Sequence, residues 1–253
     1  MTLKTFPLQV ERTTAITPTI IEVAFRRADG EPLVYTAGQF LNIHIETAGG
    51  PAQRSYSIAT APGSEQGVVA IAVSPVEGGL ATELLFGAKP GDRIVASGPY
   101  GRFVLRDDPP GRYVLAGTGT GVTPYRAMLP ELERRVASGQ HRIELLLGVW
   151  RREELLYGRE FVAMAARHPQ FRFHACYSRD FPASPEAWER RGYVQTHFAN
   201  LGLDPARDVI YLCGNPDMID ESMEQLRAMQ FPTRNLRREK YLPSRTGPQS
   251  VAE

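Results

Sequence analysis

Cysteine is nearly absent from this sequence, which has only Cys176 and Cys213 among its 253 residues. With so few thiols we expect no disulfide framework, and an iron–sulfur cluster with four cysteine ligands cannot form within one chain. The five histidines show no spacing typical of a metal site and no pairing of a nucleophile with a base. We therefore expect no metal, and one-electron chemistry would require a separate carrier.

The sequence also lacks a dominant charge and any long apolar run. Lys and Arg number 29 and Asp and Glu 28, so the net charge of +1 does not favour a nucleic-acid partner. No apolar run approaches the roughly 20 residues that span a bilayer, and residues 1–6 do not resemble a signal core. We expect a cytoplasmic monomer with no membrane partner. The basic stretch 234–240 is either a solvated surface or a docking edge for an acidic partner.

The chain changes rhythm near residues 107–111, which predicts two domains and a two-domain α/β fold. The first part has short β-rich runs separated by turn residues, typical of a six-stranded antiparallel β-barrel: 8–15, 20–26, 39–46, 54–59, 68–74 and 93–96, with one helix at 81–86. The second part alternates strands with helices, which favours a parallel sheet covered on both faces: strands 113–116, 143–149, 171–177 and 209–213, and helices 124–137, 158–167 and 216–229. We expect a barrel domain over 1–107, an α/β nucleotide-binding domain over 108–241 and a loose tail over 242–253.

A glycine-rich segment, Gly-Thr-Gly-Thr-Gly-Val-Thr-Pro at 117–124, follows the apolar run 113–116. A turn of this kind between a strand and a helix lets backbone N–H groups approach a phosphate closely, and the helix N-terminus favours negative charge. By itself the segment predicts only a ligand that carries phosphate.

The segment Arg54-Ser55-Tyr56-Ser57 lies in a predicted barrel strand. Because alternate side chains of a strand leave on opposite faces, Arg54 and Tyr56 share one face. A guanidinium suits a pyrophosphate, and an aromatic ring two residues on suits a flavin ring, which the Ser57 hydroxyl would approach. The alternative is a surface arginine with a core tyrosine.

Two further segments fit a dinucleotide. Gly78-Gly79-Leu80-Ala81-Thr82 would offer N–H groups and a hydroxyl to a diphosphate, or would form a plain turn with Thr82 as a helix cap. Cys213-Gly214-Asn215-Pro216 ends a predicted strand, where open α/β sheets bind ligands. Cys213 would otherwise be a small buried hydrophobe. Cys176 has no such context and is expected in the core.

Taken together, the motifs at 35–40, 54–57, 98–103, 117–124 and 213–216 resemble those of the ferredoxin–NADP reductase family, in the same order. The resemblance implies a barrel that holds FAD and an α/β domain that holds NADP(H). Arg54 would contact the FAD pyrophosphate, Tyr56 would stack on the isoalloxazine, and Ser57 would lie beside the flavin N5. The implied FAD residues are Arg54, Ser55, Tyr56, Ser57, Ile58, Gly78, Gly79, Leu80, Ala81 and Thr82. The implied nicotinamide nucleotide residues include Gly117, Thr118, Gly119, Thr120, Gly121, Thr123, Cys213, Gly214 and Asn215.

The preference for NADP over NAD depends on which residues meet the 2′-phosphate. Ser178 and Arg179 follow the predicted strand 171–177, and hydroxyl plus guanidinium suit a phosphate. Arg191 and Tyr193 resemble the family's basic residue and adenine-stacking tyrosine. Trp150 stands where bacterial relatives often have arginine, and either Arg151 or Arg152 compensates or neither does.

Tyr241 resembles the aromatic residue that covers the outer flavin face in this family, with a plain surface tyrosine as the alternative. Ser57, Cys213 and Tyr241 are thus the expected catalytic residues. The implied reaction is hydride transfer between NADP(H) and FAD, with single electrons passed to a small acidic carrier, a ferredoxin or flavodoxin. Two rival functions are a flavin or ferric reductase and an electron-transfer subunit of a larger redox complex.

Overall fold

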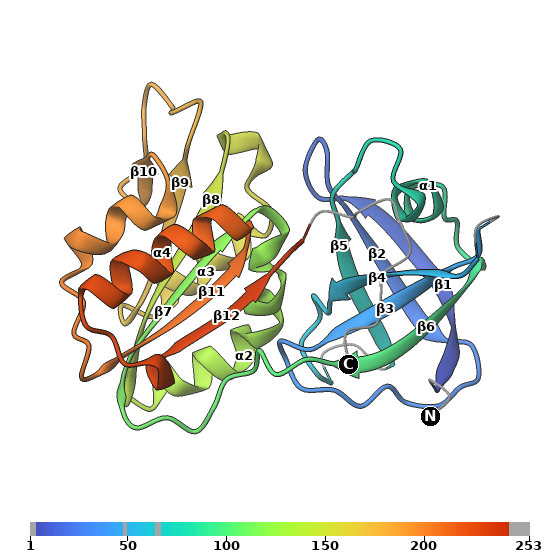
Figure 1. Ribbon diagram of the computed structural model, residues 1–253, viewed down its shortest axis with the longest axis horizontal. Helices are drawn as coiled ribbons and strands as arrows, with labels where there is room; N and C mark the ends of the chain where they lie inside the picture. Colours follow the sequence, from blue (N-terminus) through green and yellow to red (C-terminus); the bar gives the residue numbers. More distant parts are fainter. Residues whose placement is uncertain (1–3, 48–49, 64–66, 243–253) are drawn as a thin grey trace.

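Two six-stranded sheets form the protein, and the computed structural model describes residues 4–47, 50–63 and 67–242 (Figure 1). The first sheet is antiparallel, with the order β4-β3-β6-β1-β2-β5. An isolated bridge between Ile58 and Ile71 joins its two ends, so the predicted barrel is confirmed. Its strands are β1 (Thr5–Ala15), β2 (Ile21–Arg27), β3 (Phe40–Ile45), β4 (Ala52–Ser57), β5 (Val68–Val73) and β6 (Arg93–Tyr100).

Side-chain alternation explains how the barrel strands pack. Strand β3 buries every second residue, as expected when one face meets a core and the other meets solvent. Strand β5 is buried throughout, because one face lines the barrel and the other lies against the second domain. The short helix α1 (Leu80–Phe86) contributes Ala81 and Leu85 to the barrel core.

The second sheet is entirely parallel, with the order β10-β9-β8-β7-β11-β12. Its strands are β7 (Gly111–Thr118), β8 (His141–Val149), β9 (Phe171–Tyr177), β10 (Glu189–Arg191), β11 (Asp208–Gly214) and β12 (Leu236–Lys240). The chain builds outward from β7 to β10 and then returns to place β11 on the other side of β7. The strand order therefore reverses between β7 and β11, where ligands of open α/β sheets bind.

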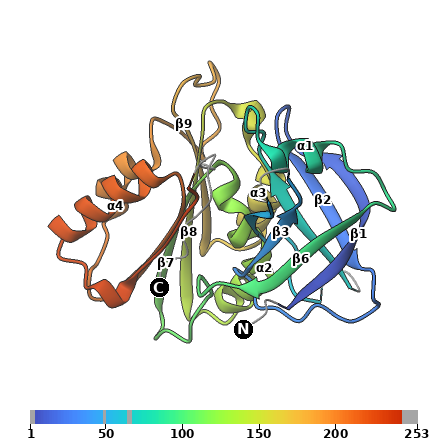
Figure 2. The same cartoon turned by 45° about the vertical axis from the view of Figure 1, so that its right-hand side comes forward.

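Helices cover both faces of this sheet. Figure 2 shows α2 (Thr123–Ala137) and α3 (Gly158–Arg167) between the sheet and the barrel, with α4 (Pro216–Ala228) on the far face. Short 3₁₀ helices complete the connections: η1 (Gly119–Val122), η2 (Arg152–Glu154), η3 (Val194–Leu201) and η4 (Thr233–Asn235). No helix in the described part of the chain has the length and apolar character needed to cross a bilayer.

Two strands of the parallel sheet were not predicted, and one of them corrects an expectation. The basic stretch 234–240 contains β12, so it is not a fully solvated surface, whereas the docking edge stays a prediction because Arg234 and Arg238 are exposed. Arg237 is only 8% exposed, donates to Asp108 at 2.7 Å and lies over the Tyr211 ring. Lys240 is paired with Asp220. Strand β10 has only three residues. The predicted tail lies outside the described residues from 243 onward.

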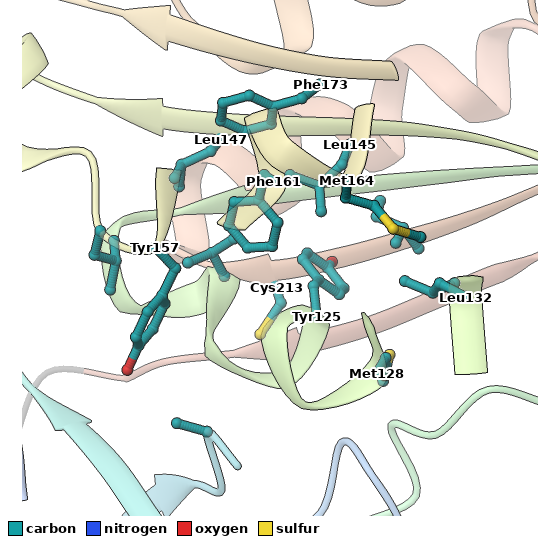
Figure 3. Packing of buried hydrophobic residues seen from close by; sticks show 14 of the residues in the cluster. Tyr125, Met128, Leu132, Leu145, Leu147, Tyr157, Phe161, Met164, Phe173 and Cys213 are labelled. Atoms are coloured by element: carbon teal, nitrogen blue, oxygen red, sulfur yellow. The ribbon is translucent and has the colours of Figure 1, made fainter. Parts of the chain in front are cut away.

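The barrel and the α/β domain share a continuous apolar cluster. Ala24, Ala59 and Ala70 of the barrel side belong to the same buried cluster as Tyr125 and Met128 of α2. Figure 3 shows the sheet side of this cluster, where Tyr125 and Phe161 project from the helices toward Leu145, Leu147 and Phe173. Burial of this surface fixes the orientation of the two domains.

A buried polar group crosses the same interface. Glu22 on β2 accepts hydrogen bonds from Arg126 of α2 at 3.0 Å and from the Tyr157 hydroxyl at 2.9 Å. The Arg126 guanidinium also lies 4.3 Å from the centre of the Tyr157 ring and donates to Glu160. Because Glu22 is 8% exposed, this group supplies directional bonds where the apolar contacts supply none.

The first prediction concerns this interdomain group. Replacing Glu22 with alanine leaves the buried Tyr157 hydroxyl and the partly buried Arg126 guanidinium with one partner fewer, so we expect the free energy of unfolding in urea to fall by about 1–3 kcal/mol. The matched control is Glu11→Ala on the same barrel, where Glu11 and Arg26 lie 3.6 Å apart at the surface. That change is expected to cost less than ~0.5 kcal/mol. Equal losses in the two variants would contradict the role given to Glu22.

Candidate functional site

Two loops meet at the point where the strand order reverses. The Thr118 hydroxyl accepts the backbone N–H of Asn215 at 2.8 Å, joining the glycine-rich loop after β7 to the turn after β11. A Cβ added at Gly121 would lie 2.4 Å from the carbonyl oxygen of Cys213, and Gly214 has a φ of +118°. Only glycine permits this close approach, which leaves a cradle of backbone at the head of α2.

The predicted phosphate loop extends from the end of β7 into α2. Gly117 and Thr118 belong to β7, and Gly119, Thr120 and Gly121 form η1. Thr123 begins α2, and its buried hydroxyl has no hydrogen-bond partner among the described residues. The loop thus has the strand–turn–helix context that phosphate binding requires.

Residues from both domains meet beside this loop. Tyr241 follows β12, and its hydroxyl donates to the Ser57 hydroxyl at the end of β4 at 2.6 Å. The Ser57 hydroxyl in turn lies 3.3 Å from a carboxyl oxygen of Glu239. Cys213 lies next to the last residue of β11 and is fully buried, and its protonation is coupled to Glu239 and Tyr241. We call Ser57, Cys213, Glu239 and Tyr241 the junction.

Burial controls protonation in the junction. It raises the pKa of the Cys213 thiol well above its usual value, and the nearby Glu239 carboxyl raises it further. The Tyr241 pKa is also raised well above its usual value by burial. Burial raises the pKa of Glu239 to about 7, against the opposing effect of the Ser57 hydrogen bond. Thiol and phenol therefore keep their protons at neutral pH, while Glu239 titrates there.

Glu239 is the junction residue that the sequence analysis missed. It lies in the stretch interpreted as a basic surface, where its charged neighbours Arg238 and Lys240 hide it. The position of Glu239 could have identified it, because in a strand its side chain lies on the same face as those of Arg237 and Tyr241. Arg237 is buried, and Tyr241 was already a candidate.

The barrel residues of the predicted FAD site differ from one another in burial and in hydrogen-bond partners. Arg54 and Tyr56 share one partly buried face of β4, and burial raises the pKa of Tyr56 to about 12. Arg54 has no carboxylate partner in the described ranges and donates only to the neighbouring Gln53 carbonyl. Ser55 is exposed and donates to Asn42. The Ile58 side chain is buried in the barrel core, so the side chain itself is not available to a ligand.

The segment 78–82 forms the turn that leads into α1. Gly78 has a φ of +64°, and Gly79 is the N-cap of the helix. The Thr82 hydroxyl oxygen accepts the backbone N–H of Val76 at 2.9 Å, which leaves its hydrogen for another acceptor. Leu80 is 41% exposed, whereas Ala81 is buried in the barrel core. An open glycine turn next to a hydroxyl is compatible with a diphosphate.

The residues predicted to bind the 2′-phosphate lie at the carboxyl ends of the neighbouring strands β9 and β10, away from β11 and β12. Ser178 and Arg179 come directly after β9, and Arg191 ends β10 opposite Tyr177. The Arg179 guanidinium lies 4.0 Å from the centre of the Trp150 ring, and that of Arg191 lies 4.7 Å from the centre of the Phe181 ring. Tyr193 is 61% exposed. The structure brings the predicted residues to one edge of the sheet.

The two arginines suggested as substitutes at Trp150 are both engaged elsewhere. Arg152 is bonded to the buried carboxylate of Glu189, at 2.7 Å for its Nε donor. Arg151 lies 3.6 Å from Glu154. Arg152 therefore cannot serve a ligand without breaking a buried ion pair.

A cavity of about 1010 Å³ lies at the opposite end of the parallel strands. Two of the arginines that line it are paired: Arg112 with Asp208 and the Leu201 carbonyl, and Arg172 with Glu144. It lies far from the carboxyl ends of the strands, so we do not assign it to the site. Among the described residues, no group of three His, Cys, Asp or Glu side chains is arranged to hold a metal.

Comparisons with known proteins agree with this geometry. A family model for the oxidoreductase FAD-binding domain matches residues 7–105, and one for the oxidoreductase NAD-binding domain matches residues 115–224. Ferredoxin–NADP reductase B of Sorangium cellulosum is 35% identical, and the match covers 89% of this chain and 93% of that protein. The toluate 1,2-dioxygenase electron transfer component of Pseudomonas putida is 31% identical over 88% of this chain, which spans 64% of that protein.

Solved structures give the same result. The Amycolatopsis cytochrome P450 reductase superposes with a TM-score of 0.83 at 30% identity, covering 95% of this chain and 71% of that one. A ferredoxin NADP⁺ reductase from Neisseria gonorrhoeae with bound FAD and NADP superposes with a TM-score of 0.79 at 21% identity, covering 94% and 98%. The second similarity shows a shared fold.

The second prediction follows from Glu239. Its pKa is near 7 in the folded protein and near 4.5 when unfolded, so the folded state binds the proton more tightly. Stability from this group is complete below pH ~4.5 and is lost as pH rises toward ~7. We expect the unfolding free energy of the wild type, relative to Glu239→Gln, to fall by about 3 kcal/mol across that window and then level off. A difference that stays constant with pH would show that Glu239 titrates normally.

Proposed function

We propose a function for this chain, which belongs to the ferredoxin–NADP reductase family of flavoprotein oxidoreductases. It moves electrons between NADPH and a small carrier protein through a bound FAD. The junction is the observation that carries the proposal. It places the end of the barrel strand β4 against the carboxyl ends of β11 and β12, with Ser57 and Tyr241 in hydrogen-bond contact. A flavin on the first domain and a nicotinamide on the second would meet at this place.

We assign FAD to a unit formed by residues 1–107. Arg54 has a guanidinium without a carboxylate partner among the described residues, which suits a pyrophosphate. The Tyr56 ring shares the Arg54 face and would support an aromatic ring system. The glycine turn 78–79 and the Thr82 hydroxyl would bind the diphosphate. When bound, a flavin accepts a hydride from a nicotinamide and releases electrons one at a time.

We assign the nicotinamide dinucleotide to residues 108–241. Its pyrophosphate would bind at Gly117–Gly121 and Thr123, and the nicotinamide would lie near Cys213, Gly214 and Asn215. Ser178, Arg179, Arg191 and Tyr193 would bind the other end. Two guanidinium groups lie at that end, and they favour a 2′-phosphate over a bare ribose hydroxyl, because a guanidinium can make paired, charge-assisted bonds to phosphate oxygens. We therefore propose NADPH as the preferred dinucleotide.

The junction residues would position the reacting rings and control access to them. Ser57 donates to Glu239 and accepts from Tyr241, so its hydroxyl is oriented before any ligand arrives. Tyr241 occupies the contact between the two domains, so its ring would have to move for a nicotinamide to enter. Cys213 keeps its proton because burial raises its pKa, and a neutral thiol can lie against the nicotinamide ring without a charge.

A ferredoxin or flavodoxin is the partner we propose for single electrons. The relative from Sorangium cellulosum, whose match covers 89% of this chain and 93% of that protein, is named for ferredoxin and NADP. A second candidate is the supply of electrons to an oxygenase, because another relative is the electron transfer component of toluate 1,2-dioxygenase. A free-flavin reductase is less compatible with the turn at 78–82, which we interpret as a diphosphate site that retains FAD.

The third prediction tests the function as a whole. The purified protein should contain FAD, and NADPH added without oxygen should bleach its visible absorbance faster than NADH does. Addition of a ferredoxin should then allow cytochrome c to be reduced, whereas free riboflavin should not replace the carrier. A preparation that binds no FAD, or one that reduces free flavin as well as ferredoxin, would contradict the proposal.

The fourth prediction tests the dinucleotide preference. Arg179→Ala should lower kcat/KM for NADPH about 10- to 100-fold, the usual effect of losing a hydrogen bond to a charged group, and should change the NADH value little. The matched control is Arg172→Ala, at the other end of the same strand and exposed there. An equal loss for NADPH and NADH would show that Arg179 does not contact the 2′-phosphate.

A further inference from the structure

Trp150 is a large aromatic residue in an unusual place. It directly follows β8 at the carboxyl edge of the parallel sheet, and half of its surface is exposed. An exposed tryptophan needs no special explanation when it is isolated. Here, however, its neighbour across the strand ends is Arg179, one of the residues that we propose for the 2′-phosphate.

The backbone of Trp150 holds the loop that carries Arg179. The Trp150 carbonyl accepts the backbone N–H groups of Arg179 and Asp180, at 3.1 and 3.0 Å. The preceding pair repeats this contact, because Ser178 N–H donates to the Val149 carbonyl at 3.0 Å. The ends of β8 and β9 therefore remain paired beyond the strands themselves. This pairing fixes the position of the Arg179 Cα atom relative to the indole.

The Trp150 side chain then orients the Arg179 guanidinium. The carbon atom at the centre of that group lies 4.0 Å from the centre of the indole ring, well within the range of a cation–π contact. Arginine has much rotamer freedom to lose when it binds a phosphate. A guanidinium that is already held over a ring has lost part of that freedom, while its N–H groups stay available to a ligand.

Neighbouring acids do not compete for this guanidinium. Arg179 makes no ion pair in the described part of the chain. The Glu154 carboxylate is the acid bonded to Trp150, and it accepts the backbone N–H of Trp150 at 3.3 Å and lies near Arg151. Arg152 is directed away, toward buried Glu189. The indole is thus the partner of Arg179 in the absence of a ligand.

Arg191 offers a natural comparison at the same edge. Its guanidinium lies over Phe181, 4.7 Å from the centre of that ring, and not over Trp150. A ring that positions one arginine should therefore affect binding through Arg179 and leave the contribution of Arg191 unchanged. A different effect on Arg179 and Arg191 would distinguish a specific contact between Trp150 and Arg179 from a general effect of an aromatic surface.

We propose that Trp150 is a positioning residue for dinucleotide selectivity: its indole holds the Arg179 guanidinium in the orientation that receives the 2′-phosphate. The inference rests on the proposed NADPH preference and extends it to a residue that would not touch the phosphate. It assigns selectivity to a stacked pair rather than to Arg179 alone.

Binding of two nucleotides, measured by calorimetry on the flavin-loaded protein, tests the proposal without relying on turnover. The probes are 2′,5′-ADP, which carries the 2′-phosphate, and 5′-AMP, which does not. Trp150→Ala should weaken 2′,5′-ADP about two- to fivefold, the usual range for an exposed cation–π contact, and should leave 5′-AMP unchanged. Trp150→Phe keeps a ring under the guanidinium and should restore most of the loss.

Double-mutant cycles decide whether the effect passes through Arg179. Trp150→Ala should have no further effect in an Arg179→Ala background and its full effect in an Arg191→Ala background. Additive losses with Arg179→Ala, or equal weakening of both nucleotides by Trp150→Ala, would overturn the inference while leaving the NADPH preference intact. Wild-type protein that binds the two nucleotides equally would overturn both.

Discussion

The hydrogen bond between Tyr241 and Ser57 joins one domain to the other. The candidate site depends on the relative orientation of the two domains that allows this bond. Ser57 ends a barrel strand and Tyr241 follows the last strand of the parallel sheet, so neither domain alone contains the junction. The two domains are held in this alignment by the shared apolar cluster and by the buried group around Glu22. The apolar contacts supply most of the stability, while the directional bonds of Glu22 select one orientation.

Burial determines which residues of the junction carry a charge at physiological pH. Cys213 and Tyr241 have raised pKa values and remain neutral at physiological pH, whereas Glu239 titrates near pH 7. The junction therefore has one group that changes charge in the working range, and that group is bonded to Ser57. On the β9 and β10 side of the same carboxyl edge, the guanidinium groups of Arg179 and Arg191 lie over aromatic rings. Along the carboxyl edge of the sheet, the junction beside β11 and β12 thus suits an uncharged ring, and the ends of β9 and β10 suit a phosphate.

Much of this could be predicted from the sequence, because the signals were local. Turn residues and β-rich runs predicted the barrel, and the glycine-rich loop 117–121 marked the strand that lies at the switch point. The strand β12 was missed because four of its five residues, in Leu-Arg-Arg-Glu-Lys, are charged and carry no β pattern. It forms because β11 offers a free edge and because Asp108 neutralises Arg237, a partner 129 positions away. Glu239 was missed for the same reason, and the stacking of Arg179 on Trp150 depends on strand order, which local patterns do not fix.

The central claim is that the junction brings two redox rings together. The most direct measurement is the rate at which flavin absorbance is lost after oxygen-free mixing with NADPH that carries deuterium at the transferred position. We predict a primary isotope effect in the wild type and a rate lower by about 10- to 100-fold in Ser57→Ala, with FAD still bound. Bleaching at the same rate in both proteins, with no isotope effect, would contradict the account.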